Sequence, residues 1–198
     1  MTRVVGVLLA AGAGSRMRRP KALVVGDDGE PWVRTAARVL IDGGCDDVLV
    51  VLGAEAEQAR ALLDGLRSVV ADDWADGIAA SLRAGLAAAG DADAALVHLV
   101  DLPDVGADVA RRIIAVADDT VLARATYAGR PGHPVLIGRD HWAGVIDSAS
   151  GDSGARDYLS AHDAVEIDCS DLASGRDVDC LPGSPNDSAT SSGPMLEG

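Results

Sequence analysis

The chain opens with an apolar run, Val4–Leu9, that passes without a break into a loop of alanine, glycine and serine, Ala10–Ser15. Four cations follow within six residues: Arg16, Arg18, Arg19 and Lys21. Gly12 and Gly14 have no Cβ, so the backbone there can take up positive φ and bring N–H groups close to an anion. The cations would neutralise the charge of that anion. This stretch therefore predicts a first strand that leads into a phosphate-binding loop.

Two other interpretations of this stretch stay open. A cation before an apolar run that ends in small residues is also the pattern of a secretory signal peptide. A buried strand, a flexible turn and a solvated basic patch would bind nothing. Two known glycine-rich motifs are excluded by spacing, because both the P-loop and the dinucleotide fingerprint require a glycine where this chain has Met17.

Composition limits the class of protein and its partners. The 198 residues suffice for one domain with a sizeable core, and 48% hydrophobic with 24% charged residues is typical of a globular protein. Because aromatic residues make up only 3% and phenylalanine is absent, the core must consist of Val, Leu, Ile and Ala. A net charge of -14 argues against nucleic acid or an anionic membrane as a partner. An anionic ligand must then be attracted locally, by the opening loop.

The cysteines indicate the compartment. Cys45, Cys169 and Cys180 are an odd number without CxxC spacing, which fits a reducing environment and rules out a zinc knuckle. No apolar stretch approaches the length of a membrane span. The sequence therefore predicts a cytoplasmic location.

Short apolar runs alternate with helical patterns along most of the chain. After the opening strand, further strands are predicted at Asp47–Leu52, Ser68–Ala71, Ala94–Val100, Thr120–Ala125 and His133–Ile137. Helices are predicted at Pro31–Asp42, Ala54–Leu66, Gly77–Ala89 and Ala107–Ala117. Buried runs separated by helices predict a single-domain α/β fold over residues 1–182, a doubly wound (Rossmann-like), mostly parallel sheet with helices on both faces. Residues 183–198 are rich in Ser, Gly and Pro and predict a disordered tail.

Asp101 follows the predicted strand at 94–100. Ligands of such sheets lie beyond the carboxyl ends of the strands, so this carboxylate should face the opening loop. Carboxylates together with phosphate oxygens are what Mg²⁺ prefers. An Asp before Leu-Pro is also a common turn-former or helix cap, and that alternative stays open. Asp104 is expected to cap the helix that follows.

Three later segments carry polar residues in candidate binding positions. Gly77 and Ser81 begin a predicted helix and offer N–H groups and a hydroxyl, although a capped amphipathic helix would look the same. The segment 129–134, GRPGHP, could reach a second anionic substrate or form an ordinary turn. Asp152 and Ser153 resemble a helix N-cap. Arg156 would then lie in the first turn, which is unfavourable for a cation unless it points at an acid or a ligand.

Residues 8–23, LLAAGAGSRMRRPKAL, resemble the signature LAAGxSxRMGxPK of the MobA-like nucleotidyltransferases. The departure is Arg18, where that family usually has glycine. The helix start at 73–85 is similar to the family's W-x-x-G…SL-x-x-G segment. Ala11 in LAAG, the GHPV segment and GDSGAR at 151–156 are typical of the branch that comprises molybdenum cofactor cytidylyltransferases. The segment 176–182, RDVDCLP, resembles the family's closing DIDTP sequence, with Cys180 in place of the threonine.

The resemblance implies transfer of a nucleoside monophosphate from an NTP, CTP in this branch, to the terminal phosphate of molybdopterin cofactor, with release of pyrophosphate. A molybdoenzyme or its chaperone would receive the product. Lys21 would stabilise charge at the α-phosphate, Arg16 would hold the leaving group, and Asp101 and Asp179 would hold Mg²⁺. The implied nucleotide contacts are Leu9, Ala10, Ala11, Gly12, Ala13, Gly14, Ser15, Arg16, Lys21, Gly77 and Ser81. The implied acceptor contacts are Arg130, Gly132, His133, Asp152 and Arg156.

Other functions stay open at this point. A nucleotidyltransferase for another small phosphorylated acceptor, such as a sugar phosphate, phospholactate or methylerythritol phosphate, would keep the first half of the chain and change the second. A molybdenum-cofactor chaperone would bind without turnover, and Arg18 and the altered closing segment leave room for it. A non-enzymatic binding module would show no magnesium-dependent binding of nucleotide.

Overall fold

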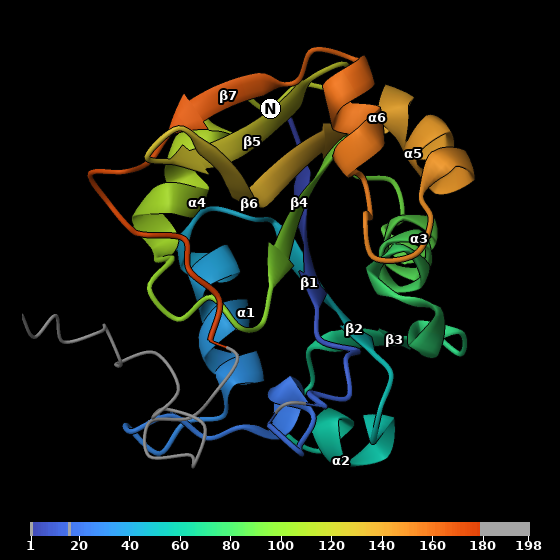
Figure 1. Ribbon diagram of the computed structural model, residues 1–198, viewed down its shortest axis with the longest axis vertical. Coiled ribbons are helices and arrows are strands. Elements are labelled where there is room, and N and C mark those ends of the chain that lie inside the picture. Colours follow the sequence, from blue (N-terminus) through green and yellow to red (C-terminus); the bar gives the residue numbers. More distant parts are fainter. Residues whose placement is uncertain (1, 16, 179–198) are drawn as a thin grey trace, which may run out of the picture.

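The computed structural model describes residues 2–15 and 17–178, and within them seven strands form one sheet in the order β3-β2-β1-β4-β6-β5-β7 (Figure 1). The predictions for Arg16, Asp179 and the tail at 183–198 lie outside the described residues. The strands are β1 (Val4–Leu9), β2 (Asp47–Leu52), β3 (Arg67–Val70), β4 (Ala94–Leu99), β5 (Leu122–Tyr127), β6 (Arg130–Gly138) and β7 (Val165–Asp168). All neighbouring pairs are parallel except those of β6, which is antiparallel to both β4 and β5. The predicted mostly parallel sheet is confirmed.

Helices cover both faces of this sheet, as predicted (Figure 1). The α-helices are α1 (Trp32–Asp42), α2 (Ala56–Arg60), α3 (Ile78–Ala88), α4 (Ala107–Ile114), α5 (Trp142–Ser148) and α6 (Arg156–Ala161). Short 3-10 helices are η1 (Lys21–Leu23), η2 (Trp74–Asp76) and η3 (Arg139–His141). None of the helices in the described part of the chain is long and apolar enough to cross a membrane.

The core consists of two aliphatic layers, one on each face of the sheet. Because side chains alternate along a strand, Leu8 of β1 packs in the layer under α1 and α4, whereas Val7 packs in the layer under α3, α5 and α6. Both residues are fully buried. The central strands are buried on both faces, which explains why they appear in the sequence as continuous apolar runs.

The predicted helix at Ala54–Leu66 is wrong in extent, because α2 contains only Ala56–Arg60. Glu55 before it adopts a left-handed conformation with φ +52°, which a helix cannot include. After it, Leu62 and Leu63 donate to carbonyl groups three residues back, and Asp64 adopts φ +48°. The helix propensity of these residues favours a longer helix, but the turns at residues 62–64 lead the chain into β3 instead.

Only the first residue of the segment GRPGHP at 129–134 belongs to a turn, and the other five lie in a strand. The turn is formed by Ala128 and Gly129, both at positive φ (49° and 74°), and β6 begins directly at Arg130. Two residues in this conformation match the twist of a β-hairpin. β6 is therefore longer than the predicted strand at His133–Ile137, and it runs back along β5.

Candidate active site

The opening loop lies at the carboxyl end of β1 and lines a cavity of about 570 Å³. Ala10 still donates to the carbonyl oxygen of Val51 at 2.9 Å, after which the loop leaves the sheet. Gly14 has φ +58°, as expected for this loop. Gly12 does not adopt positive φ; instead, no atom lies within 4 Å of the position that a Cβ would occupy there. The missing side chain of Gly12 thus leaves open space beside the loop, and the positive φ of Gly14 allows the loop to turn.

Lys21 and Asp101 meet at this cavity. Lys21 begins η1, Asp101 follows β4, and Nζ of Lys21 lies 2.5 Å from Oδ2 of Asp101. Their side chains are only 19% and 14% exposed. The predicted position of the Asp101 carboxylate, facing the opening loop, is therefore confirmed. The two residues are 80 positions apart in the sequence, and they meet because β1 and β4 end at the same edge of the sheet.

The start of α3 forms the opposite wall of the first cavity. Gly77 and the buried Ser81 line it, together with Trp74 of η2. Gly77 has φ +109°, and a Cβ there would lie 2.6 Å from Oδ1 of Asp152. The N–H groups of this helix start are not all available, because Ala79 donates to the carbonyl oxygen of Gly151 at 3.0 Å.

A second cavity of about 290 Å³ adjoins the first. The two share lining residues, Leu9, Ile78, Leu99 and Asp152. Much of the wall of the second cavity is aliphatic, formed by Leu82, Val97, Val135, Ile137 and Leu159. Its polar groups come from β5, β6 and the start of α6. The site is therefore bipartite, with a polar loop on one side and an apolar recess on the other.

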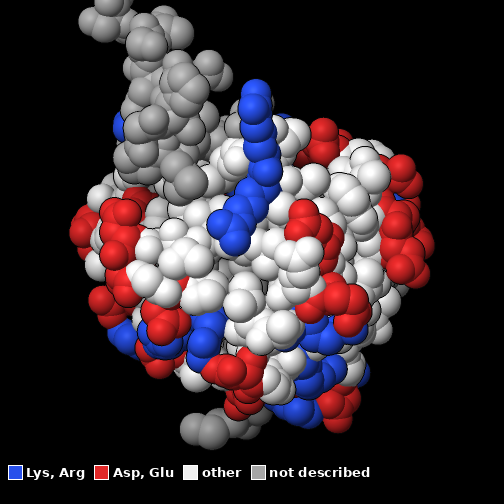
Figure 2. Space-filling model, turned by 90° about the horizontal axis from the view of Figure 1, so that it is seen from below, with Lys and Arg blue, Asp and Glu red and all other residues white. Residues whose placement is uncertain are grey.

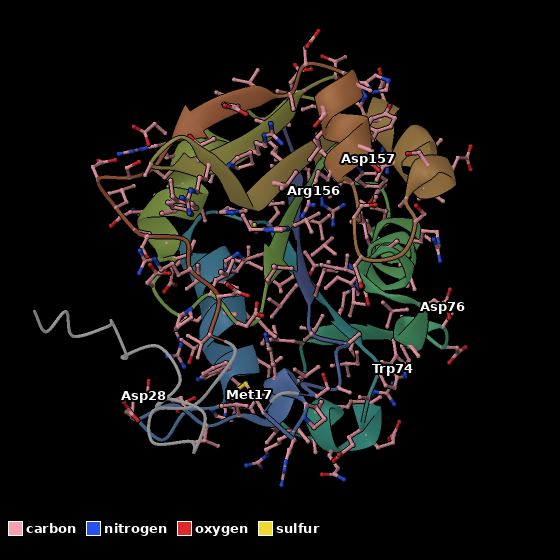
Figure 3. All side chains as sticks on the ribbon, viewed as in Figure 1. Met17, Asp28, Trp74, Asp76, Arg156 and Asp157 are labelled. Atoms are coloured by element: carbon pink, nitrogen blue, oxygen red, sulfur yellow. The ribbon has the colours of Figure 1, made fainter. Side chains whose placement is uncertain are left out.

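The structure assembles most of the predicted site residues at these two cavities. The first cavity is lined by Leu9, Ala10, Ala11, Gly12, Ala13, Gly14, Ser15, Lys21, Gly77, Ser81 and Asp101. The second is lined by Gly132, His133, Asp152 and Arg156. Arg130 lines neither, because it is exposed at the hairpin beside Tyr127. Figure 3 shows Trp74 on η2, Met17 on the opening loop and Arg156 at the start of α6.

Burial lowers the pKa of His133 to about 4, and the nearby Arg156 acts in the same direction while Asp101 opposes it. The His133 imidazole is thus neutral at pH 7. The expected N-cap by Asp152 and Ser153 is wrong, because Ala155 occupies that position and no side chain caps α6. Arg156 is the first residue of α6, as expected, and it lines the cavity.

Asp104 does not cap α4, whose N-cap is Gly106 without a side-chain hydrogen bond. Its Oδ2 instead accepts from the backbone N–H and the hydroxyl of Ser174, at 2.7 and 2.5 Å. Four residues further on, Val178 donates to the carbonyl oxygen of Asp101 at 3.0 Å. The last described residues are therefore held against the loop that follows β4, beside the metal carboxylate implied by the sequence.

The donor set at the first cavity fits a metal that arrives with phosphates. Asp101 supplies one carboxylate, and the described residues contain no group of three or more His, Cys, Asp or Glu side chains that could hold a metal by themselves. Mg²⁺ is commonly held by one or two carboxylates plus substrate phosphates. Figure 2 shows the molecule from below, where one basic side chain lies across a mostly uncharged central surface and acidic side chains lie beside it and around the margin.

Among the cavity-wall residues that were not predicted as site residues are Trp74 and Arg124. Trp74 packs so closely that a Cβ on Gly53 would lie 2.6 Å from its Cγ. The signals for Trp74 were its place in the W-x-x-G segment and a glycine, Gly53, directly after a buried strand. For Arg124 the signal was a single cation within the otherwise uncharged strand LARATY.

Two curated proteins with different named activities are similar to this chain. A relative 40% identical over 190 residues, nicotine blue oxidoreductase of Paenarthrobacter nicotinovorans, is matched over 90% of this chain and 93% of its own length. 2-C-methyl-D-erythritol 4-phosphate cytidylyltransferase of Rhodococcus jostii is 36% identical over 139 residues, which are 68% of this chain and 54% of that protein.

Among solved structures, Rv0371c of Mycobacterium tuberculosis H37Rv has a TM-score of 0.76 and 30% identity, over 90% of this chain and 94% of that chain. Its complex with manganese has a TM-score of 0.70 and 31% identity, over 84% and 88%. The family described as MobA-like NTP transferase domain matches residues 6–165. The chain belongs to this family of MobA-like NTP transferase domains.

Proposed function

We propose that this protein transfers CMP from CTP to the terminal phosphate of molybdopterin cofactor and releases pyrophosphate. The observation that carries the proposal is the convergence of Lys21 and Asp101, 2.5 Å apart, on a cavity lined by the glycine loop. Nucleotidyl transfer needs positioning and charge neutralisation rather than a nucleophile–base pair. A buried cation, a carboxylate and open backbone N–H groups meet that need.

The roles of the residues follow from this geometry. A phosphate oxygen of the acceptor attacks the α-phosphorus in line, and the bond to the bridging oxygen of the β-phosphate breaks, so that pyrophosphate takes the electron pair. Lys21 stabilises the charge that develops at the α-phosphate. The loop around Gly12, with Arg16, holds the β- and γ-phosphates. No covalent intermediate with the protein is needed.

Asp101 would hold Mg²⁺, with Asp179 as a proposed second ligand. The metal supplies neutralisation of the triphosphate charge when it is bound. A structure of the relative Rv0371c is a complex with manganese, which supports the use of a divalent cation in the family. The choice of CTP rests on Ala11 in LAAG, and the related cytidylyltransferase of Rhodococcus jostii supports the same base.

The acceptor would lie in the second cavity, against His133, Asp152 and Arg156. This cavity shares a wall with the first, so a phosphate at its mouth would lie beside the α-phosphate of a bound nucleotide. Arg130 would contribute only if an acceptor extended beyond the cavity to the hairpin. Recipients of the product would be a molybdoenzyme or its chaperone.

A second candidate is reduction of a flat acceptor, because the relative that is 40% identical over 90% of this chain is named an oxidoreductase. In that case the opening loop, although it lacks the third glycine of the dinucleotide fingerprint, would bind the pyrophosphate of a reduced nicotinamide dinucleotide, and hydride would pass to a substrate in the apolar second cavity. Both chemistries use the same two cavities. They differ in whether the α–β phosphate bond breaks.

The test measures pyrophosphate release with CTP or GTP, Mg²⁺ or Mn²⁺, and molybdenum-loaded molybdopterin as acceptor, with methylerythritol phosphate as the alternative acceptor. We expect release with CTP and molybdopterin, and its loss in Asp101→Ala. The matched control is Asp108→Ala, which removes an exposed carboxylate that pairs with Arg111 on α4. Activity of Asp101→Ala equal to that of the control would overturn the metal assignment. Oxidation of NADH without any pyrophosphate release would establish the second candidate.

A further inference from the structure

Arg124 is a cation within strand β5 that faces the second cavity. Its neighbours Ala123 and Ala125 pack in the opposite core layer, under α1 and α4. Arg124 instead shares the cavity wall with aliphatic side chains that include Val135, Ile137 and Leu159. Its side chain is only 14% exposed. A largely buried guanidinium on an apolar wall needs acceptors for its hydrogen bonds.

The protein supplies few of these acceptors. Nη2 of Arg124 donates to Oε1 of Glu166 at 2.6 Å, across the β5–β7 register. Within the described residues this is the one hydrogen bond that the guanidinium donates, and its Nε is buried without an acceptor. Glu166 is 49% exposed, so the pair lies partly in solvent on one side and faces the cavity on the other. The unmet donors favour a ligand that brings acceptors into the cavity.

The register of the sheet gives the distance from the reacting centre. Arg124 is paired with Val135, and Val135 is paired with Val97 of β4. Val97 is two strand spacings of about 4.8 Å from Arg124, and Asp101 lies four residues beyond Val97, about 13 Å along the strand, so the two backbones are about 16 Å apart. A ligand whose phosphate lies beside Asp101 therefore needs an extended body that spans this separation less the reach of the Arg124 side chain. A short polyol phosphate is too small and too polar for this wall.

We propose that Arg124 determines acceptor specificity by donating to the carbonyl or carboxylate edge of a planar heterocycle, at the end remote from the phosphate. The inference rests on the proposed function only in placing the acceptor in the second cavity. A flat ring buries its faces against the aliphatic wall, and the planar guanidinium fork matches two acceptors in one plane. If Arg124 were only structural, it would anchor β7 to β5 and would not affect the ligand.

The test uses pterin-6-carboxylate, a fluorescent heterocycle with a carbonyl edge, and measures its Kd by fluorescence quenching. We expect Arg124→Gln to weaken binding of this probe by about tenfold or more, as for the loss of a hydrogen bond to a charged group. Arg124→Lys keeps the charge and the pairing with Glu166 but removes the fork, so it should lose affinity for the probe while keeping the melting temperature. Arg112→Gln, which removes another ion-paired arginine outside both cavities, should bind within twofold of the unaltered protein.

Two results would overturn the proposal. One is the absence of probe binding by the unaltered protein up to millimolar concentration, or displacement of the probe by glycerol 3-phosphate at the same concentration. The other is equal Kd values for the unaltered protein, Arg124→Gln and Arg124→Lys. Pyrophosphate release from CTP is measured separately. Arg124-dependent binding of the probe without any release would refute the proposed nucleotidyl transfer and leave this inference intact.

Discussion

Replacing Gly14 or Gly12 by alanine separates the two tasks of the opening loop. At Gly14, φ is +58°, and an added Cβ would lie 2.0 Å from the carbonyl oxygen of Arg19 and 3.4 Å from the backbone nitrogen of Lys21. At Gly12, the same Cβ would have no atom within 4 Å, and φ is not positive. The two substitutions add the same methyl group at positions two residues apart, yet only the methyl group at position 14 would contact the backbone.

The cost at Gly14 has two parts. A residue with a Cβ in the left-handed conformation costs about 1–2 kcal/mol. A contact with backbone atoms cannot be relieved by rotating a side chain, and overpacking of this kind costs about 1–3 kcal/mol. The smaller entropy of the unfolded alanine chain returns about 0.4–1 kcal/mol. We therefore expect Gly14→Ala to lower the free energy of unfolding by about 1–5 kcal/mol.

Gly12→Ala should change the free energy of unfolding by less than about 1 kcal/mol, because neither strain nor contact opposes it. Its methyl group would nevertheless occupy the space through which phosphates approach the loop. Urea unfolding gives the stability of each variant, and the thermal shift with CTP and Mg²⁺ gives nucleotide binding. A Gly14→Ala variant as stable as the unaltered protein, or a Gly12→Ala variant with the full thermal shift with CTP, would contradict these two roles of the loop glycines.

Three further substitutions test other parts of the molecule. Gly77→Ala should cost about 1–3 kcal/mol in urea unfolding, because φ is +109° and the new Cβ would meet Asp152; an unchanged urea midpoint contradicts this. Arg18→Gly should raise the melting temperature by about 2–4 °C, since Arg18 has φ +53°, whereas Arg18→Ala should give no gain. Burial, and to a smaller extent the nearby His133, lower the pKa of His98 to about 3. Between about pH 6.5 and pH 3, His98 is therefore protonated in the unfolded chain and neutral in the folded protein. Stability should therefore fall as the pH falls through that range, and His98→Leu should reduce the fall, as measured by urea unfolding at pH 7 and pH 4.5.

Much of the fold was predictable because its signals are local. The strand at Val4–Leu9 and the strand at Asp47–Leu52 have the predicted bounds, since runs buried on both faces admit little else. The approach of Lys21 to Asp101 followed from one topological rule, that parallel strands present their carboxyl ends at one edge. That rule needs no knowledge of how the intervening elements pack.

Other features depend on backbone conformations that the residue types do not indicate. The hairpin turn contains Ala128 at φ +49°, a conformation that alanine seldom adopts, so the more conspicuous prolines and glycines beside it attracted the prediction of a turn. Glu55 at φ +52° shortens α2 in the same way. The partner of Asp104 is Ser174, which is 70 residues away and could not be inferred from a local capping pattern.

The reversal of β6 is what builds the acceptor side of the site. Because β6 is antiparallel to β4, its first residues lie at the carboxyl end of β4, and Val135 is paired with Val97. His133 therefore comes close enough to Asp101 for the carboxylate to influence its pKa. Had 129–134 been a turn leading into a parallel strand, His133 would lie at the amino end of β4, at the opposite edge from the glycine loop. The two-residue hairpin at Ala128 and Gly129 thus decides that the apolar recess adjoins the phosphate loop, which is the condition for transfer between two bound substrates.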